Sequence, residues 1–137
     1  MFLQNNKHLN LLERSLDSAT LRQKVIANNI ANVDTPFFKR SFVQFEDLLQ
    51  NELDRSSSSF TGYRTHPKHL EIGSASFGQL RPVITEDGTT SMNNNNNNVD
   101  IDFEMTLMAK NQLRYNALIE QINHDFKQIR TAIDGRG

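Results

Sequence analysis

Residues 101–133 read IDFEMTLMAKNQLRYNALIEQINHDFKQIRTAI, and the apolar side chains of this stretch recur at alternating steps of four and three. Such spacing places them along one side of an α-helix, as in the seam of a coiled coil. One seam position, Gln112, is polar. The seam consists of Ile101, Met105, Met108, Gln112, Tyr115, Ile119, Ile122, Phe126, Ile129 and Ile133.

Both ends of this helix are marked in the sequence. Acidic residues crowd its start between 100 and 104, and Lys127 and Arg130 lie near its end, which complements the helix dipole. Asn98 or Asp100 is available as the N-cap, and Gly135 is placed to end the helix. The C-terminal helix is therefore the best-defined element of the chain.

A second seam of the same kind occupies residues 9–33, again with one polar position, Gln23. Pro36 lacks a backbone donor and disfavours helical geometry at Thr35, so we expect this helix to end near Val33. The seam consists of Leu9, Leu12, Leu16, Ala19, Gln23, Ile26, Ile30 and Val33.

Each seam needs a partner, because the middle of the sequence offers few apolar residues. We predict a mainly α fold in which the terminal helices pair as an antiparallel, coiled-coil-like hairpin. If the two seam glutamines meet, a buried amide gains a partner and fixes the register. That register puts Leu9 near Phe126, Leu16 near Ile119 and Ile30 near Met105.

Two questions about the apolar residues of these helices remain open. A three-four stripe is more often the buried face of an ordinary amphipathic helix than a coiled coil. Further apolar residues also lie off the seams, where either neighbouring subunits or the chain's own middle segment would cover them. These off-seam residues are Leu11, Leu21, Val25, Leu107, Leu113 and Leu118.

The middle segment, residues 37–97, lies between the two parts of a terminal-helix assembly domain, residues 1–36 and 98–134. Its apolar residues predict a short helix from Val43 to Asp54, followed by a serine-rich flexible linker around residues 55–62. Short apolar patches between 66 and 90 allow at most a strand or two. Six consecutive asparagines, Asn93 to Asn98, are interpreted as a disordered connector.

Composition excludes several functional classes. A net charge of -1 and a pI near 6.4 provide no basic field for nucleic acid or an anionic membrane. The absence of cysteine removes disulfides, thiolate nucleophiles and cysteine-bound zinc. Only 36% of residues are apolar and mean hydropathy is -0.59, so burial against partners is expected. The N-terminus lacks the pattern of a cleaved signal peptide.

No catalytic constellation is present in the sequence. His66 and His69 are spaced for a metal, but Pro67 lies between them and no further ligands follow at the usual spacing. We therefore expect no metal, no cofactor, no small-molecule substrate and no enzymatic activity.

Two motifs resemble one known family. The first is ANNIANVDTP at residues 27–36, and the second comprises NNVDID at 97–102 and NQLRYNAL at 111–118. Both are similar to bacterial flagellar axial proteins of the rod and hook class, the second most of all to the proximal rod subunit. The resemblance implies a structural subunit of the periplasm-spanning basal-body rod, exported by the flagellar type III apparatus without a cleaved leader. It also implies contacts with other rod and basal-body proteins and with copies of the same chain.

The chain departs from the family pattern at two glycines. Phe37 stands where the family has glycine after the Thr-Pro pair, so the turn there lacks glycine's conformational freedom. An asparagine replaces the glycine shortly before the NVDID run, and asparagine tolerates left-handed geometry better than most residues.

We therefore expect a self-assembling rod subunit whose terminal segments are partly disordered in the free monomer and become ordered on assembly. The alternative is a soluble coiled-coil adaptor or export chaperone that never polymerises. Three asparagines near the first helix end are expected to cap backbone groups or bond between subunits. The expected interaction residues are Leu9, Leu12, Leu16, Ile26, Asn28, Asn29, Ile30, Asn32, Met105, Met108, Gln112, Tyr115, Ile119, Ile122, Phe126 and Ile129.

Overall fold

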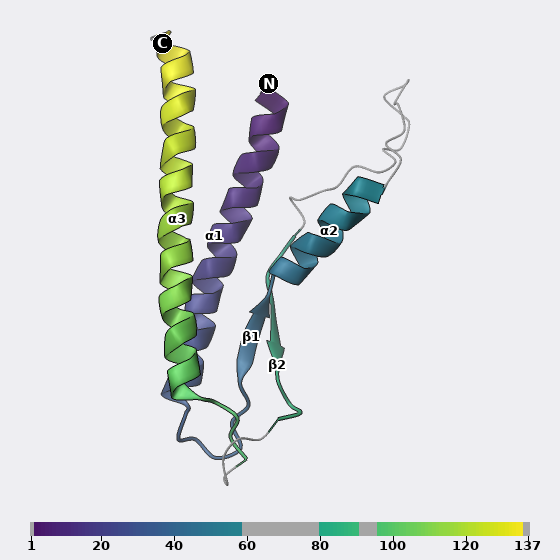
Figure 1. Cartoon of the computed structure of the whole chain (residues 1–137), viewed down its shortest axis with the longest axis vertical. Coiled ribbons are helices and arrows are strands. Elements are labelled where there is room, and N and C mark those ends of the chain that lie inside the picture. The colour runs from purple at the N-terminus through teal and green to yellow at the C-terminus, as the bar shows by residue number, and fades with distance from the viewer. Residues whose placement is uncertain (1, 59–79, 91–95, 136–137) are drawn as a thin grey trace.

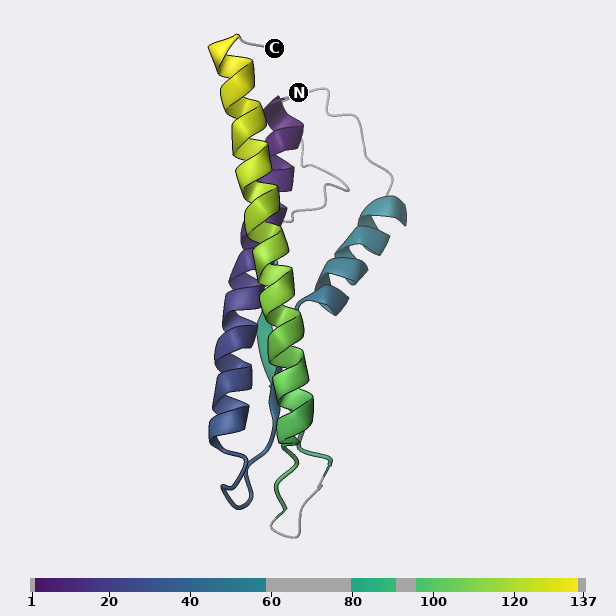
Figure 2. The ribbon, with the colours of Figure 1, turned by 60° about the vertical axis from the view of Figure 1, so that its left-hand side comes forward.

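The computed structural model describes residues 2–58, 80–90 and 96–135. Its elements, in chain order, are α1 (Phe2–Ala31), β1 (Ser41–Gln44), α2 (Glu46–Ser58), β2 (Val83–Glu86) and α3 (Ile101–Asp134). Helices α1 and α3 run antiparallel along most of the molecule, and the two termini lie at the same end (Figures 1 and 2). The predicted mainly helical fold with paired terminal helices is confirmed.

The predicted seam of α1 faces α3. Leu12, Ala19 and Ile26 are buried, and the remaining seam positions are half-buried. Helix α1 ends at Ala31, two residues before the predicted Val33.

The predicted seam of α3 is only half correct. Its positions Met108, Tyr115, Ile122 and Ile129, spaced by seven residues, are half-buried as expected. The intervening positions turn outward and are exposed, apart from the half-buried Ile119. In their place, the residues one position earlier, Glu104, Asn111, Leu118 and Asp125, are buried or half-buried.

Both ends of α3 are capped as predicted. The Asp100 carboxylate accepts hydrogen bonds from the amides of Asp102 and Phe103, and Gly135 is left-handed at φ 63°. The last turn holds no basic residue, because the helix continues to Asp134, which Arg130 contacts at 3.7 Å.

Strands β1 and β2 pair antiparallel, with Val43 opposite Ile84, and β1 lies against α1. The predicted helix start at Val43 is wrong, because Val43 is a buried residue of β1, the buried Phe45 lies between β1 and α2, and α2 begins only at Glu46. Residues 55–58 are the last turn of α2 and not a flexible linker. One predicted strand region, 66–79 with both histidines, lies outside the described residues.

The chain itself covers the off-seam face of α1. Val25 is buried, and Leu11 and Leu21 are half-buried. On α3, Leu107 and Leu118 are half-buried, whereas Leu113 is 71% exposed. The described part of the chain, which includes β1 packed against α1, thus covers these α1 residues but not Leu113.

The asparagine run was wrongly interpreted at its end. Asn97 is fully buried, and its Nδ2 lies 2.9 Å from each of three backbone oxygens at the end of α1, those of Asn32, Val33 and Thr35. Its Oδ1 accepts the amide of Val99 at 2.7 Å. Asn97 therefore fastens the start of α3 to the end of α1. Asn93, Asn94 and Asn95 lie outside the described residues.

Asn98, the last asparagine of the run, connects the segment before β1 to the segment after β2. Its Oδ1 accepts the amide of Arg40 at 2.7 Å, and its Nδ2 donates to the carbonyl of Asp87 and to the Thr90 hydroxyl, each at 2.8 Å. An amide side chain can both donate and accept, so one buried residue joins two segments that are far apart in sequence.

Two described residues other than glycine are left-handed, and both lie where the sequence departs from the family pattern: Phe37 after the Thr-Pro pair, and an asparagine of the run before NVDID. Phe37 has φ 62° and Asn96 has φ 60°. Asparagine adopts this geometry at modest cost, but for a bulky residue it costs roughly 1–2 kcal/mol. Phe37 is also 72% exposed, so packing returns little of that cost.

We expect Phe37→Gly to raise the free energy of unfolding by about 1 kcal/mol, because glycine adopts φ 62° without strain. Urea denaturation of both chains measures the change. Phe38→Gly is the matched control: Phe38 is half-buried and not left-handed, so its loss is expected to destabilise. An equal fall in stability for both variants would contradict the assignment of strain to Phe37.

Candidate subunit interface

Three polar residues of α3 face the core, and we call Glu104, Asn111 and Asp125 the polar ladder. Their exposed fractions are 0%, 4% and 8%. Buried polar groups are costly unless they find partners, so each step of the ladder holds α3 to another element. The partners come from the loop before β1 and from two levels of α1.

The first step is an ion pair. The Glu104 carboxylate Oε1 accepts from Nε of Arg40, whose guanidinium lies 5.1 Å from the centre of the Phe103 ring. Cation–π geometry of this kind adds to the attraction. The other Glu104 oxygen, Oε2, has no hydrogen-bond partner among the described residues. Arg40 is therefore the group that makes a buried charge at Glu104 tolerable.

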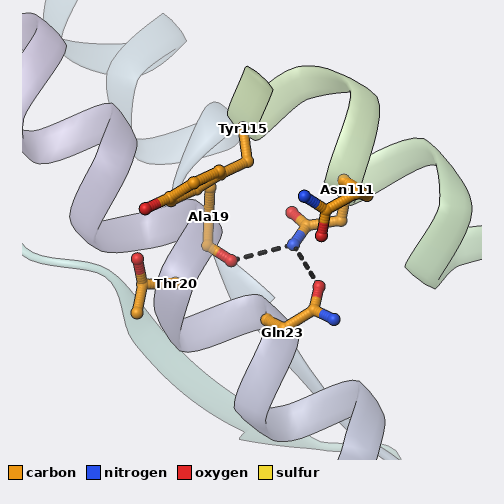
Figure 3. A pocket seen from close by; sticks show the side chains of 6 residues that line it. Ala19, Thr20, Gln23, Asn111 and Tyr115 are labelled. Atoms are coloured by element: carbon orange, nitrogen blue, oxygen red, sulfur yellow. Dashed lines mark hydrogen bonds between the residues drawn. The ribbon is translucent and has the colours of Figure 1, made fainter. Parts of the chain in front are cut away.

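The second step replaces the predicted pair of glutamines. Nδ2 of Asn111 donates to the Ala19 carbonyl at 2.9 Å and to Oε1 of Gln23 at 3.1 Å (Figure 3). The predicted Gln23–Gln112 contact is thus wrong by one residue. Because the two positions are about 100° apart on a helix, this change turns the apolar seam of α3 away from α1.

The third step lies near the free ends of the helices. His8 Nε2 is 3.2 Å from Oδ2 of Asp125, which forms an ion pair when His8 is protonated, although this oxygen accepts no hydrogen bond from the described residues. Gln121 donates to Oδ1 of Asp125 at 3.0 Å. The predicted neighbours here were Leu9 and Phe126, again one residue away on each helix. The predicted alignment of the two helices along their axes was therefore nearly correct, but the predicted rotation of α3 about its own axis was wrong.

Turning α3 by one residue exposes an apolar row that we call the outward stripe: Ile101, Met105, Phe126 and Ile133. Their exposed fractions are 43%, 58%, 56% and 75%. Between Met105 and Phe126 the seven-residue spacing passes through the exposed, polar Gln112 and the half-buried Ile119. Large apolar side chains exposed along one side of a helix are typical of an interaction surface.

The outward stripe borders a cavity between the two helices. Its volume is about 180 Å³, and Ala19, Thr20, Gln23, Asn111, Gln112 and Tyr115 line it (Figure 3). None of these six residues carries a formal charge. Asn111 Oδ1 has no hydrogen-bond partner among the described residues, although the atom is buried. The cavity therefore suits a largely apolar side chain accompanied by a hydrogen-bond donor.

The sixteen predicted interaction residues divide between the inside and the outside of the monomer. Leu12, Ile26 and Asn29 are buried within the chain, whereas Asn28, Met105, Gln112 and Phe126 are exposed. The others are half-buried along the helix pair: Leu9, Leu16, Ile30, Asn32, Met108, Tyr115, Ile119, Ile122 and Ile129.

The three asparagines of the ANNIAN motif have different roles. Asn29 donates to the Ser41 carbonyl at 2.7 Å and accepts the Ser41 amide at 3.0 Å, which fixes β1 against α1. Asn32 donates to the carbonyl and the side chain of Asn28, each at 2.8 Å, and so caps the last turn of α1. The expected capping is confirmed for Asn32. For Asn29 the bond is made to a strand.

Glu46 joins three helices. Standing at the start of α2, it accepts from Arg22 of α1 at 2.6 Å and from Arg114 of α3. Burial opposes its ionisation, but the Arg22 hydrogen bond, its own backbone amide and the two arginine charges outweigh that effect and hold the pKa of Glu46 below its ordinary value. Figures 1 and 2 show α2 diverging from the pair beyond this point.

Because the pKa of Glu46 is lowered on folding, its stabilisation is present above the ordinary value of 4.5 and is lost as pH falls through the folded pKa. We expect Glu46→Gln to lower the urea midpoint at neutral pH, and the gap from the unaltered chain to close in acid below that pKa. The exposed Glu120→Gln is the control and should differ little at either pH. A gap that stayed constant with pH would contradict the ionic role of Glu46.

Sequence reasoning missed Arg40, Glu46, Glu104, Asn111 and Asp125. One signal was available: Glu104, Asn111 and Asp125 fall on the same seven-residue spacing as the apolar seam. Polar residues at that spacing indicate a specific partnered seam, as single buried asparagines do in coiled coils. Arg40 and Glu46 give no comparable signal, because their partners are remote in sequence.

Among the helices that the structure describes, none combines the length and the apolar character needed to span a membrane.

Comparison with known proteins identifies the family. The family model described as "Flagella basal body rod protein" matches residues 9–39, which cover most of α1 and the turn through Phe37. The flagellar basal body rod protein FlgB of Bacillus subtilis (strain 168) is 41% identical over 124 residues, 90% of this chain and 91% of the relative. FlgB of Borrelia hermsii is 41% identical over 128 residues, 91% of this chain and 94% of the relative.

FlgB of Borreliella burgdorferi is 36% identical over 118 residues, 85% of this chain and 87% of the relative. Similarity therefore extends over both terminal helices and the middle segment and is not confined to the N-terminal motif. These relatives are named as structural components and not as enzymes. The chain belongs to the FlgB family of flagellar basal body rod proteins.

Proposed function

We propose that this chain polymerises through α1 and α3 and, with other rod and basal-body proteins, forms the axial shaft of the flagellar basal body. A structural rod subunit is what the family membership supports. We propose in addition that the chain leaves the cytoplasm through the flagellar type III apparatus.

The observation that carries the assembly proposal is the outward stripe. Four large apolar side chains of one helix are between 43% and 75% exposed, although their heptad spacing is suited to packing against another helix. Burying one such side chain contributes roughly 1.5–3 kcal/mol. A neighbouring subunit that covers the stripe would therefore supply much of the association energy.

We further propose that the terminal segments become ordered fully only on assembly, since α3 buries several polar groups and leaves its apolar stripe outside. Amide exchange along the chain at low and high concentration tests this. Fast exchange at the free ends of α1 and α3 in dilute monomer, with protection on association, is the expected result. Core-like protection at every concentration would favour the non-polymerising adaptor.

Sedimentation of Phe126→Gln tests the stripe. The variant is expected to associate at least about tenfold more weakly than the unaltered chain, because one buried phenylalanine is worth more than the 1.4 kcal/mol that tenfold requires. Thr131→Gln is the matched control, exposed at a similar height but on the opposite side of α3. Equal association of both variants would remove the stripe from the interface.

A further inference from the structure

We propose that Leu113 of one copy inserts into the cavity between α1 and α3 of an adjacent copy, forming a side-by-side contact that repeats around the rod. This inference rests on the proposed assembly function and names one of its contacts. It joins two features that the monomer leaves unused: the cavity lined by Thr20 and Tyr115, and an isolated exposed leucine.

Leu113 has the form of a knob. It is 71% exposed, and the residues one turn before and after it on the same side of α3 are Ala109 and Ala117, both exposed. Small neighbours at i−4 and i+4 let another helix approach closely, so the leucine projects beyond its surroundings. Within the described part of the chain, no element covers this side chain.

The cavity has the form of a matching hole. A water molecule takes up about 30 Å³ of liquid volume, so a cavity of about 180 Å³ has room for a four-carbon side chain. Its lining is neutral, and leucine brings no charge that would have to be desolvated. Lys110 and Asn116 flank Leu113 at i−3 and i+3. When Leu113 is inserted, their side-chain N–H donors come near Asn111 Oδ1 of the adjacent copy, a buried acceptor without a hydrogen-bond partner among the described residues.

Geometry selects a second copy as the occupant. On α3, Leu113 lies between the cavity residues Gln112 and Tyr115 in height but points about 130° away from them. Leu113 and the cavity therefore lie on different faces of α3, at the same height along its axis. A contact between two different faces is heterologous, and its repetition produces a ring or a continuing helix of subunits instead of a closed pair. That is the symmetry a tubular shaft requires.

Cysteine cross-linking tests the contact directly, because the chain has no cysteine of its own. Copies carrying Leu113→Cys are mixed with copies carrying Thr20→Cys under mild oxidation. We expect the mixed dimer at least about tenfold more abundantly than with Thr131→Cys in place of Leu113→Cys. Thr131 lies on the same side of α3 about 27 Å further along the axis. Equal yields from the two mixtures would overturn the assignment.

Filling the hole gives a second test. Thr20→Phe is expected to weaken association at least about tenfold, whereas Thr131→Phe should not. Both threonines are exposed and donate to the carbonyl four residues earlier, so the two changes cost similar helix stability, which circular dichroism checks. Unchanged association of Thr20→Phe would overturn the contact.

The outcomes separate this contact from the wider function. If Phe126→Gln weakens association while the cross-links are equal, the chain polymerises but not through Leu113. If the unaltered chain remains monomeric and no cross-link forms, both proposals fail. If Thr20→Phe blocks incorporation into basal bodies in cells without any cross-link between copies, the cavity accepts a different rod protein and the second-copy assignment is wrong.

Discussion

Replacing Asn97 with leucine is expected to lower the free energy of unfolding by roughly 3–5 kcal/mol, although the two side chains have the same number of heavy atoms and the same branching. Asn97 is fully buried and bonds to three backbone oxygens at the end of α1 and to the Val99 amide. Each buried group left without a partner costs roughly 1–3 kcal/mol. The carbonyls of Asn32 and Thr35 keep the backbone amides of Thr35 and Phe38 as donors, so the sum is smaller than four full penalties.

Urea denaturation followed by helical circular dichroism measures the loss. Asn123→Leu is the matched control, since Asn123 is exposed on α3 and surface changes of this kind usually stay within about 0.5 kcal/mol. If the two variants unfold at the same midpoint, the bonds of Asn97 do not secure the junction between α1 and α3. Loss of the α1 end alone, with α3 intact, would likewise argue against a single fastened joint.

Apolar periodicity was sufficient to predict the two terminal helices and their pairing as a hairpin. Residue types at the ends of α3 predicted a cap at Gly135 and left its N-cap open between Asn98 and Asp100, of which the structure has Asp100. These features depend on local backbone chemistry and on a repeat that each helix carries in its own sequence. The position along α3 that Gln23 faces was also predicted nearly correctly. Each seam has one polar position, and few registers of the two helices avoid leaving an amide without a partner.

Rotation of α3 could not be predicted from the apolar residues alone. The seam through Met105 and Phe126 looks better than the observed one, yet the structure prefers the face with Glu104 and Asn111. Their partners, Arg40 on a loop and the Ala19 carbonyl on α1, become visible only when distant segments come together. A strongly apolar row turned outward is thus the consequence of satisfying polar groups inside, and this row is the surface that we propose for subunit interaction.

The predictions for residues 41–44 and for Asn97 were wrong for a related reason. Composition indicated a helix at Val43 and disorder at the asparagines, but the Asn29 side chain pairs with Ser41, and three carbonyls just after α1 accept the Asn97 side chain. Tertiary hydrogen bonds overrode local propensity at both places.

The buried ion pair of Arg40 and Glu104 leads to the second large expectation. Arg40→Met is expected to lower the free energy of unfolding by roughly 3–5 kcal/mol, because Glu104 is fully buried and would keep an uncompensated charge. Arg114→Met is the control: its pair with Glu46 is half-exposed on both sides, and exposed pairs contribute about 1 kcal/mol or less.

A double-mutant cycle separates the cost of stranding the charge from the worth of the pair. In the Arg40→Met background, Glu104→Leu removes the stranded carboxylate, so most of the lost stability should return, since apolar replacements of buried pairs are often neutral or stabilising. Additive losses in the double variant would show that Arg40 acts through packing on Phe103 and not through the charge. If stability returns, α3 is held in rotation by electrostatics, and the double variant is free to turn its apolar seam inward. The same variant should then associate more weakly, because the outward stripe exists only while Glu104 keeps its face of α3 toward the core.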